Sequence, residues 1–106
     1  MWEPYKKGFK AYLQLERSLA ANSVEAYLRD IDKLTDYLQA IEKLITPQQL
    51  QLKDLEKFVQ WISELGMTAT SQSRIISGLR SFYAYCYMEQ IVTVNPTALL
   101  ETPKQK

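Results

Sequence analysis

The segment NSVEAYLRDIDKLTDYLQAI at residues 22–41 carries the clearest helical pattern in this chain. Its apolar side chains recur every three or four residues, which is the spacing of one face of an α-helix. The recurring positions are Val24, Tyr27, Leu28, Ile31, Leu34, Leu38 and Ile41. Asn22 and Ser23 are both suited to cap the start of such a helix, and Glu25 favours its first turn. The segment therefore predicts a long amphipathic helix that packs one face against the rest of the chain.

The flanking segments carry the same pattern, so further helices are expected on both sides of this one. These helices are predicted at residues 4–17, 52–65 and 70–88. Pro4 suits a first helical position, and Gly66 has the place after a helix where a left-handed turn favours glycine. A short fifth helix is predicted at 96–101, because Asn95 can cap it and Pro96 suits its first position. The chain is thus predicted to be all-α.

The composition is that of one globular domain. The 106 residues are 46% hydrophobic and 24% charged, which allows one apolar core. We expect residues 1–101 to form this domain and residues 102–106 to begin a linker. No apolar run is long enough for a membrane span or a signal peptide, so a cytoplasmic location is expected. The single cysteine, Cys86, and the absence of histidine exclude an internal disulfide and the usual zinc sites.

The helix at 70–88 carries the main candidate surface. Between Leu65 and Met88 there is no aspartate or glutamate, whereas Arg74 and Arg80 are both present. We therefore expect both guanidinium groups to be unopposed by carboxylates. Forked guanidinium donors among short side chains suit a phosphate backbone or a DNA groove, because the helix can approach closely. An ordinary solvent-exposed helix face is the other interpretation, although glutamate and lysine would stabilise such a face better than serine does. The candidate surface comprises Thr70, Ser71, Ser73, Arg74, Ser77, Arg80, Ser81 and Ala84.

A second and weaker candidate surface lies on the polar face of the helix at 22–41. It comprises Asn22, Ser23, Ala26, Arg29 and Lys33. Acidic residues stand close by in the sequence, so a salt-bridged helix exterior is the stronger interpretation of this surface taken alone. The formal net charge of +1 does not by itself indicate a nucleic-acid partner.

No catalytic constellation is evident in the sequence. There is no histidine for general base chemistry, no Gly-rich phosphate loop, and no HExxH or GxSxG motif. Cys86 falls on the apolar face of its helix and is expected to be a small buried hydrophobic residue. We therefore predict a binding domain without catalytic residues, bound metal, cofactor or small-molecule substrate.

Two stretches of the chain, together with its C-terminal residues, resemble a known family. ERSLAANSVEAYLRDI at 16–31 is similar to the segment of Xer-type tyrosine recombinases in which a short turn leads into a capped helix with an Ala-Tyr-x-x-Asp-Leu core. ATSQSRIISGLRSFY at 69–83 is similar to the helix of the same family with the form S-x-x-R-x-x-S-x-[LIV]-[RK]-x-F-[YF]. An Asn-Pro turn at 95–96 and the Leu-Glu-Thr-Pro-Lys sequence at 100–104 match the expected lead into a catalytic domain. The chain resembles XerD-like members of the family, and phage integrases share the domain more loosely.

This resemblance implies a core-binding domain that folds as a four-helix SAM-like orthogonal bundle, here with the short fifth helix. In the family this domain and the catalytic domain together form a C-shaped clamp around duplex DNA, and four protomers assemble on two DNA sites. The arginines, lysine, histidines and tyrosine that carry the chemistry lie in the catalytic domain, so this chain is expected to bind DNA and not to cut it. The implied DNA contacts are Asn22, Ser23, Ala26, Arg29, Thr70, Ser71, Arg74, Ser77, Arg80 and Ser81.

Two other functions stay open at this point. A helical protein-interaction module without a nucleic-acid role is favoured a little by the near-neutral charge, and it would present an apolar groove to its partner. A small stand-alone enzyme is the weakest alternative, because no acid–base pair is evident.

Overall fold

The four long helices predicted from the residue spacing are all present. The structure, a computed structural model, describes residues 1–103, and within this range it contains no strand. The helices are α1 (Glu3–Leu15), α2 (Ala21–Ala40), α3 (Leu52–Glu64) and α4 (Ala69–Met88). The all-helical class is therefore confirmed, whereas the part of the predicted linker at residues 104–106 lies outside the described residues.

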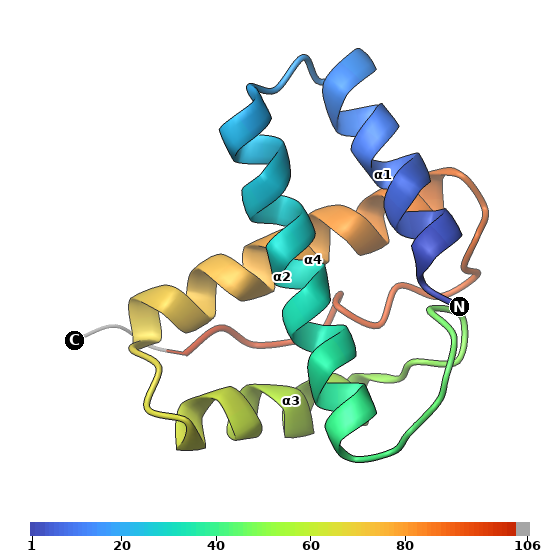
Figure 1. Cartoon of the computed structure of the whole chain (residues 1–106). Coiled ribbons are helices and arrows are strands. Elements are labelled where there is room, and N and C mark those ends of the chain that lie inside the picture. The colour runs from blue at the N-terminus through green and yellow to red at the C-terminus, as the bar shows by residue number, and fades with distance from the viewer. Residues whose placement is uncertain (104–106) are drawn as a thin grey trace.

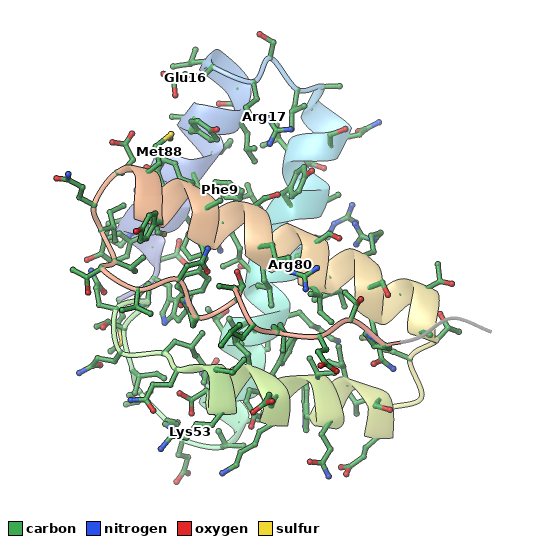
Figure 2. The ribbon with its side chains drawn as sticks, turned by 180° about the vertical axis from the view of Figure 1, so that it is seen from behind. Phe9, Glu16, Arg17, Lys53, Arg80 and Met88 are labelled. Atoms are coloured by element: carbon green, nitrogen blue, oxygen red, sulfur yellow. The ribbon has the colours of Figure 1, made fainter. Side chains whose placement is uncertain are left out.

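The helices pack around the crossing of α2 and α4. Figure 1 shows α1 and α2 as an antiparallel hairpin, with α4 running across it and α3 beneath the far end of α2. Helices α2 and α4 each contact all three other helices. The residues after α4 turn back and run between α3 and α4, toward the start of α4 (Figures 1 and 2). This arrangement leaves one side of the α2–α4 crossing open to solvent.

The core is made by the apolar stripes that the sequence predicted. Phe9 of α1 meets Phe82 of α4 edge-on, with ring centroids 5.5 Å apart. Tyr83 is fully buried, and its hydroxyl donates a hydrogen bond of 2.9 Å to the carbonyl oxygen of Pro47. Ile41 was expected to face inward and is exposed instead, because it is the cap residue just beyond α2.

Two helix starts differ from the prediction. Helix α2 begins at Ala21 after an extended Ala20, so Asn22 and Ser23 lie inside the first turn and neither caps it. Helix α4 begins at Ala69, and the Thr68 hydroxyl accepts a hydrogen bond from the Ser71 amide. At α3 the expected ending is confirmed, because Gly66 has a φ of +90° directly after the cap residue.

The predicted fifth helix is wrong. Residues 96–99 form a turn, and an irregular segment follows as far as residue 103. Asn95 does cap this turn, since its Oδ1 accepts hydrogen bonds from the Thr97 amide at 2.9 Å and the Thr97 hydroxyl at 2.7 Å. The segment buries Thr97 and Leu100 in its irregular conformation, and a helix of six residues is too short to be stable by itself. Burial of the extended chain against its neighbours therefore overrides the local helix signal.

Cys86 was predicted to be a small buried hydrophobic residue, and the structure confirms this. Cys86 is fully buried, and burial raises the pKa of its thiol to about 12, as suits a small packed side chain. None of the helices in residues 1–103 combines the length and the apolar character required to cross a lipid bilayer.

Candidate functional site

Helices α2 and α4 approach each other closely where they cross at Gly78. A Cβ atom added to Gly78 would lie 2.7 Å from Cγ and 2.8 Å from Cβ of Asp30, so only glycine fits here. The missing side chain lets a buried carboxylate of α2 lie directly against the backbone of α4. Asp30 is only 3% exposed. The crossing thus places the carboxylate of Asp30 against α4, which has no aspartate or glutamate of its own.

A groove opens on the solvent side of this crossing. It has a volume of about 230 Å³ and is formed by residues of α2 and α4 only. Its lining consists of Ser23, Ala26, Tyr27, Asp30, Arg74 and Ser77. Four of these six, Ser23, Ala26, Arg74 and Ser77, belong to the contacts implied by the family resemblance. Two surfaces that were separate in the sequence therefore form one site, which we call the α2–α4 groove.

Arg74 and Asp30 form an ion pair across the α2–α4 groove. Nη2 of Arg74 lies 3.1 Å from Oδ1 of Asp30, and the arginine side chain is 58% exposed. Burial raises the pKa of Asp30 to about 6, although the positive charges of Arg74 and Arg29 act in the opposite direction. The carboxyl group is thus mostly ionised at neutral pH, but the protein environment does not favour its charge.

This ion pair corrects one premise drawn from the sequence. The absence of acids between Leu65 and Met88 led us to expect that neither arginine of the 70–88 helix faces a carboxylate. That expectation is wrong for Arg74, because the helix crossing supplies Asp30 from a residue 44 positions away. Arg74 is therefore not an uncompensated charge. What supports a binding role for Arg74 is its position, because its exposed side chain lines the α2–α4 groove.

Arg80 lies on a different side of α4. Its guanidinium donates a hydrogen bond to the carbonyl oxygen of Leu100, and its side chain is half-buried beside the C-terminal segment (Figure 2). Arg74 and Arg80 are six residues apart, which separates them by about 120° around the helix axis. They mark the two edges of a strip of small residues, and Ser77 lies between them. Within residues 1–103 Arg80 forms no ion pair, so no carboxylate compensates its positive charge.

The other expected contacts surround the groove without lining it. Asn22 and Arg29 are exposed on α2, while Ser81 is half-buried on α4. Thr70 and Ser71 are exposed at the start of α4. The Ser71 amide and hydroxyl are both engaged by the Thr68 hydroxyl, at 3.2 and 3.1 Å. The Ser71 amide is therefore already occupied and does not offer a free donor to a phosphate.

Three residues of this site were not predicted from the sequence: Tyr27 as a lining residue, Asp30 as a partner and Gly78 as the contact point. A signal for two of them was present. Asp30 lies three residues after Tyr27 and four before Leu34, which places it in the apolar stripe. Gly78 has the same relation to Ile75 and Phe82. A carboxylate and a glycine inside two buried stripes indicate a close crossing of those stripes.

Comparison with known proteins identifies relatives of this chain. Residues 7–90 match the model of the phage integrase N-terminal SAM-like domain. The chain is 34% identical over 105 residues to the tyrosine recombinase XerD of Chlorobaculum tepidum, which covers 96% of this chain and 34% of that protein. It is 34% identical over 97 residues to the tyrosine recombinase XerD of Listeria monocytogenes serotype 4b, covering 92% and 33%. No solved structure matches the chain. The chain spans about a third of the length of these relatives.

Proposed function

Because the chain belongs to the family of phage integrase N-terminal SAM-like domains, we propose that it is the DNA-binding N-terminal domain of a tyrosine site-specific recombinase or integrase. Its ligand is double-stranded DNA, which lies across the α2–α4 groove. The observation that carries this proposal is that Ser23, Ala26, Ser77 and Arg74 converge on one groove from two helices.

The chemistry of the groove suits a polyanion with a regular backbone. Short side chains let both helices approach a duplex closely, and the exposed Arg74 guanidinium offers several donors to phosphate or base edges. Arg29 and Arg80 add positive charge on the two flanks. With a formal net charge of +1, binding by this chain alone is weak and falls as salt rises. The proposed contacts are Asn22, Ser23, Ala26, Arg29, Thr70, Ser71, Arg74, Ser77, Arg80 and Ser81.

We further infer that the parent protein breaks and rejoins DNA strands in the cytoplasm, together with other recombinase protomers, and that its catalytic groups lie outside this chain. Two features of the chain support this division. The chain contains no histidine. Tyr83 and Tyr85 are buried in the core, and burial raises the pKa of both hydroxyls, which disfavours a nucleophilic role.

The test is a fluorescence anisotropy titration of a labelled duplex with the 106-residue chain at two salt concentrations. We expect measurable binding at low salt and a marked loss at high salt. Arg74→Ala should weaken binding by about tenfold, as expected for one charged hydrogen bond. It should also lower the slope of log affinity against log salt by about one unit. Lys53→Ala is the matched control, because it removes one positive charge from α3, away from the groove (Figure 2).

The same titration distinguishes DNA binding from the alternative function as a protein-interaction module. One observation favours that alternative. A second groove of about 720 Å³ lies between residues 48–52 and 91–99, and it includes the exposed side chains of Val94 and Leu99. NMR shifts on adding DNA should be confined to α2 and α4. No binding at low salt would reject the DNA proposal and leave the interaction module as the better hypothesis. Equal losses for the Arg74 and Lys53 variants would reject the α2–α4 groove as the DNA site.

A further inference from the structure

A buried carboxylate beneath an exposed arginine is the least expected feature of the α2–α4 groove. We propose that Asp30 is a positioning residue for DNA binding: it holds the Arg74 guanidinium over the groove, so that the donors not bonded to Asp30 face the DNA. This inference rests on the proposed function, because it assigns a role in DNA binding to a residue that is almost wholly buried.

The geometry of the pair supports a bridge in which Arg74 contacts both groups at once. The guanidinium carries five N–H donors, and the structure has one contact to Asp30, from Nη2 to Oδ1 at 3.1 Å. The carboxylate is 3% exposed while the arginine side chain is 58% exposed. The inner edge of the guanidinium is thus anchored, and the rest of the group is open to solvent. Arginine loses conformational freedom when it binds, so anchoring it beforehand favours binding.

Stability alone does not explain why an aspartate occupies this position. The charged groups near Asp30 are Arg74 from α4 and Arg29 from its own helix, and together they fail to offset the burial of the carboxylate. Around Asp30, helix α4 contributes one positive charge, that of Arg74, and the uncharged backbone at Gly78. An uncharged side chain of the same size would avoid the desolvation cost of a buried charge. A buried carboxylate that lowers stability and also lines the candidate site is expected where DNA binding depends on that carboxylate.

Simple electrostatics and the positioning role predict opposite results when Asp30 is neutralised. Removing one negative charge beside a polyanion should tighten binding if only long-range charge matters. If Asp30 fixes the guanidinium, the same change should weaken binding, because Arg74 then has to be ordered when DNA binds. The sign of the effect therefore separates the two explanations.

The experiment compares Asp30→Asn with Asp36→Asn in the anisotropy titration of the labelled duplex. Asp36 is exposed on the same helix and forms no ion pair within residues 1–103, so its variant carries the same charge change without the contact. We expect Asp30→Asn to weaken binding by about three- to tenfold, the equivalent of ordering one long side chain. Asp36→Asn should leave affinity unchanged or slightly raise it. Binding of Asp30→Asn that is equal to or tighter than that of Asp36→Asn would overturn the proposal.

A double-mutant cycle shows whether Asp30 acts through Arg74. In an Arg74→Ala background, Asp30→Asn should no longer weaken binding, and affinity should stay unchanged or rise slightly, as it does for Asp36→Asn. A further loss as large as in the wild-type chain would mean that the change loosens the whole domain, and it would refute the positioning role. Failure of the wild-type chain to bind DNA at all would instead reject the proposed function itself, so the two failures are distinguishable.

Discussion

Replacing Asp30 by asparagine should stabilise the folded protein, and the gain should grow with pH. Burial raises the pKa of Asp30 to about 6 from an ordinary value of 3.8, after the favourable effects of Arg74 and Arg29 are included. Between these two values the folded state binds more protons than the unfolded state does, so the stability contributed by this group falls as pH rises. A difference of roughly two pKa units corresponds to about 3 kcal/mol, and most of this cost applies at neutral pH.

The assay is urea denaturation of the wild-type chain and Asp30→Asn at about pH 5 and pH 8. The free energy of unfolding of the variant, relative to wild type, should rise over this interval by roughly half of the full effect. Asp36→Asn is the control, because its carboxyl group is exposed and unpaired within the described residues. If the stability of Asp30→Asn relative to wild type did not depend on pH, or fell as pH rises, Asp30 would not be a carboxylate whose charge is disfavoured by burial.

Three further substitutions test the packing that supports the groove. Gly78→Ala should destabilise the fold by about 1–3 kcal/mol, since the new methyl group collides with Asp30, whereas alanine in an open helix position would stabilise it; a gain in thermal stability would contradict the close crossing. Tyr83→Phe should cost about 1–3 kcal/mol in urea denaturation because it leaves the carbonyl oxygen of Pro47 without its donor; an unchanged midpoint would mean that the bond adds nothing. Thr68→Ala should lower the free energy of unfolding by about 1 kcal/mol through loss of the α4 cap, and Thr68→Ser should restore it.

These predictions describe a groove in which stability and binding oppose each other. Asp30→Asn is expected to fold more stably and to bind DNA less well, because the same buried charge that costs folding free energy also anchors Arg74. If Asp30→Asn changed the stability and the DNA affinity in the same direction, the buried charge would not be the common cause of both effects. The combination of outcomes therefore tests the groove more strictly than either measurement alone.

The helical class, the four long helices and most of the core could be predicted from the sequence alone. The three- and four-residue spacing in segments such as 22–41 admits only helices with one apolar face, and burial of those faces is expected from their composition. The sequence also indicated the polar residues of α4, because small hydroxyl side chains are unusual choices for a solvated helix, whereas the contacts on α2 were implied by the family resemblance. Local signals at single positions were less reliable, as the caps assigned to Asn22 and Ser23 and the helix at 96–101 illustrate.

Which of these residues act together depended on the packing of the helices. Asp30 and Arg74 are 44 residues apart, and nothing in their local sequences pairs them. Arg74 and Arg80 looked equivalent along α4, yet the first reaches a carboxylate of α2 and the second reaches the carbonyl oxygen of Leu100. The difference arises because periodicity specifies which face of a helix is buried but not the angle or the point at which two helices cross. That point depends on how closely the backbones approach, and here the approach is set at Gly78.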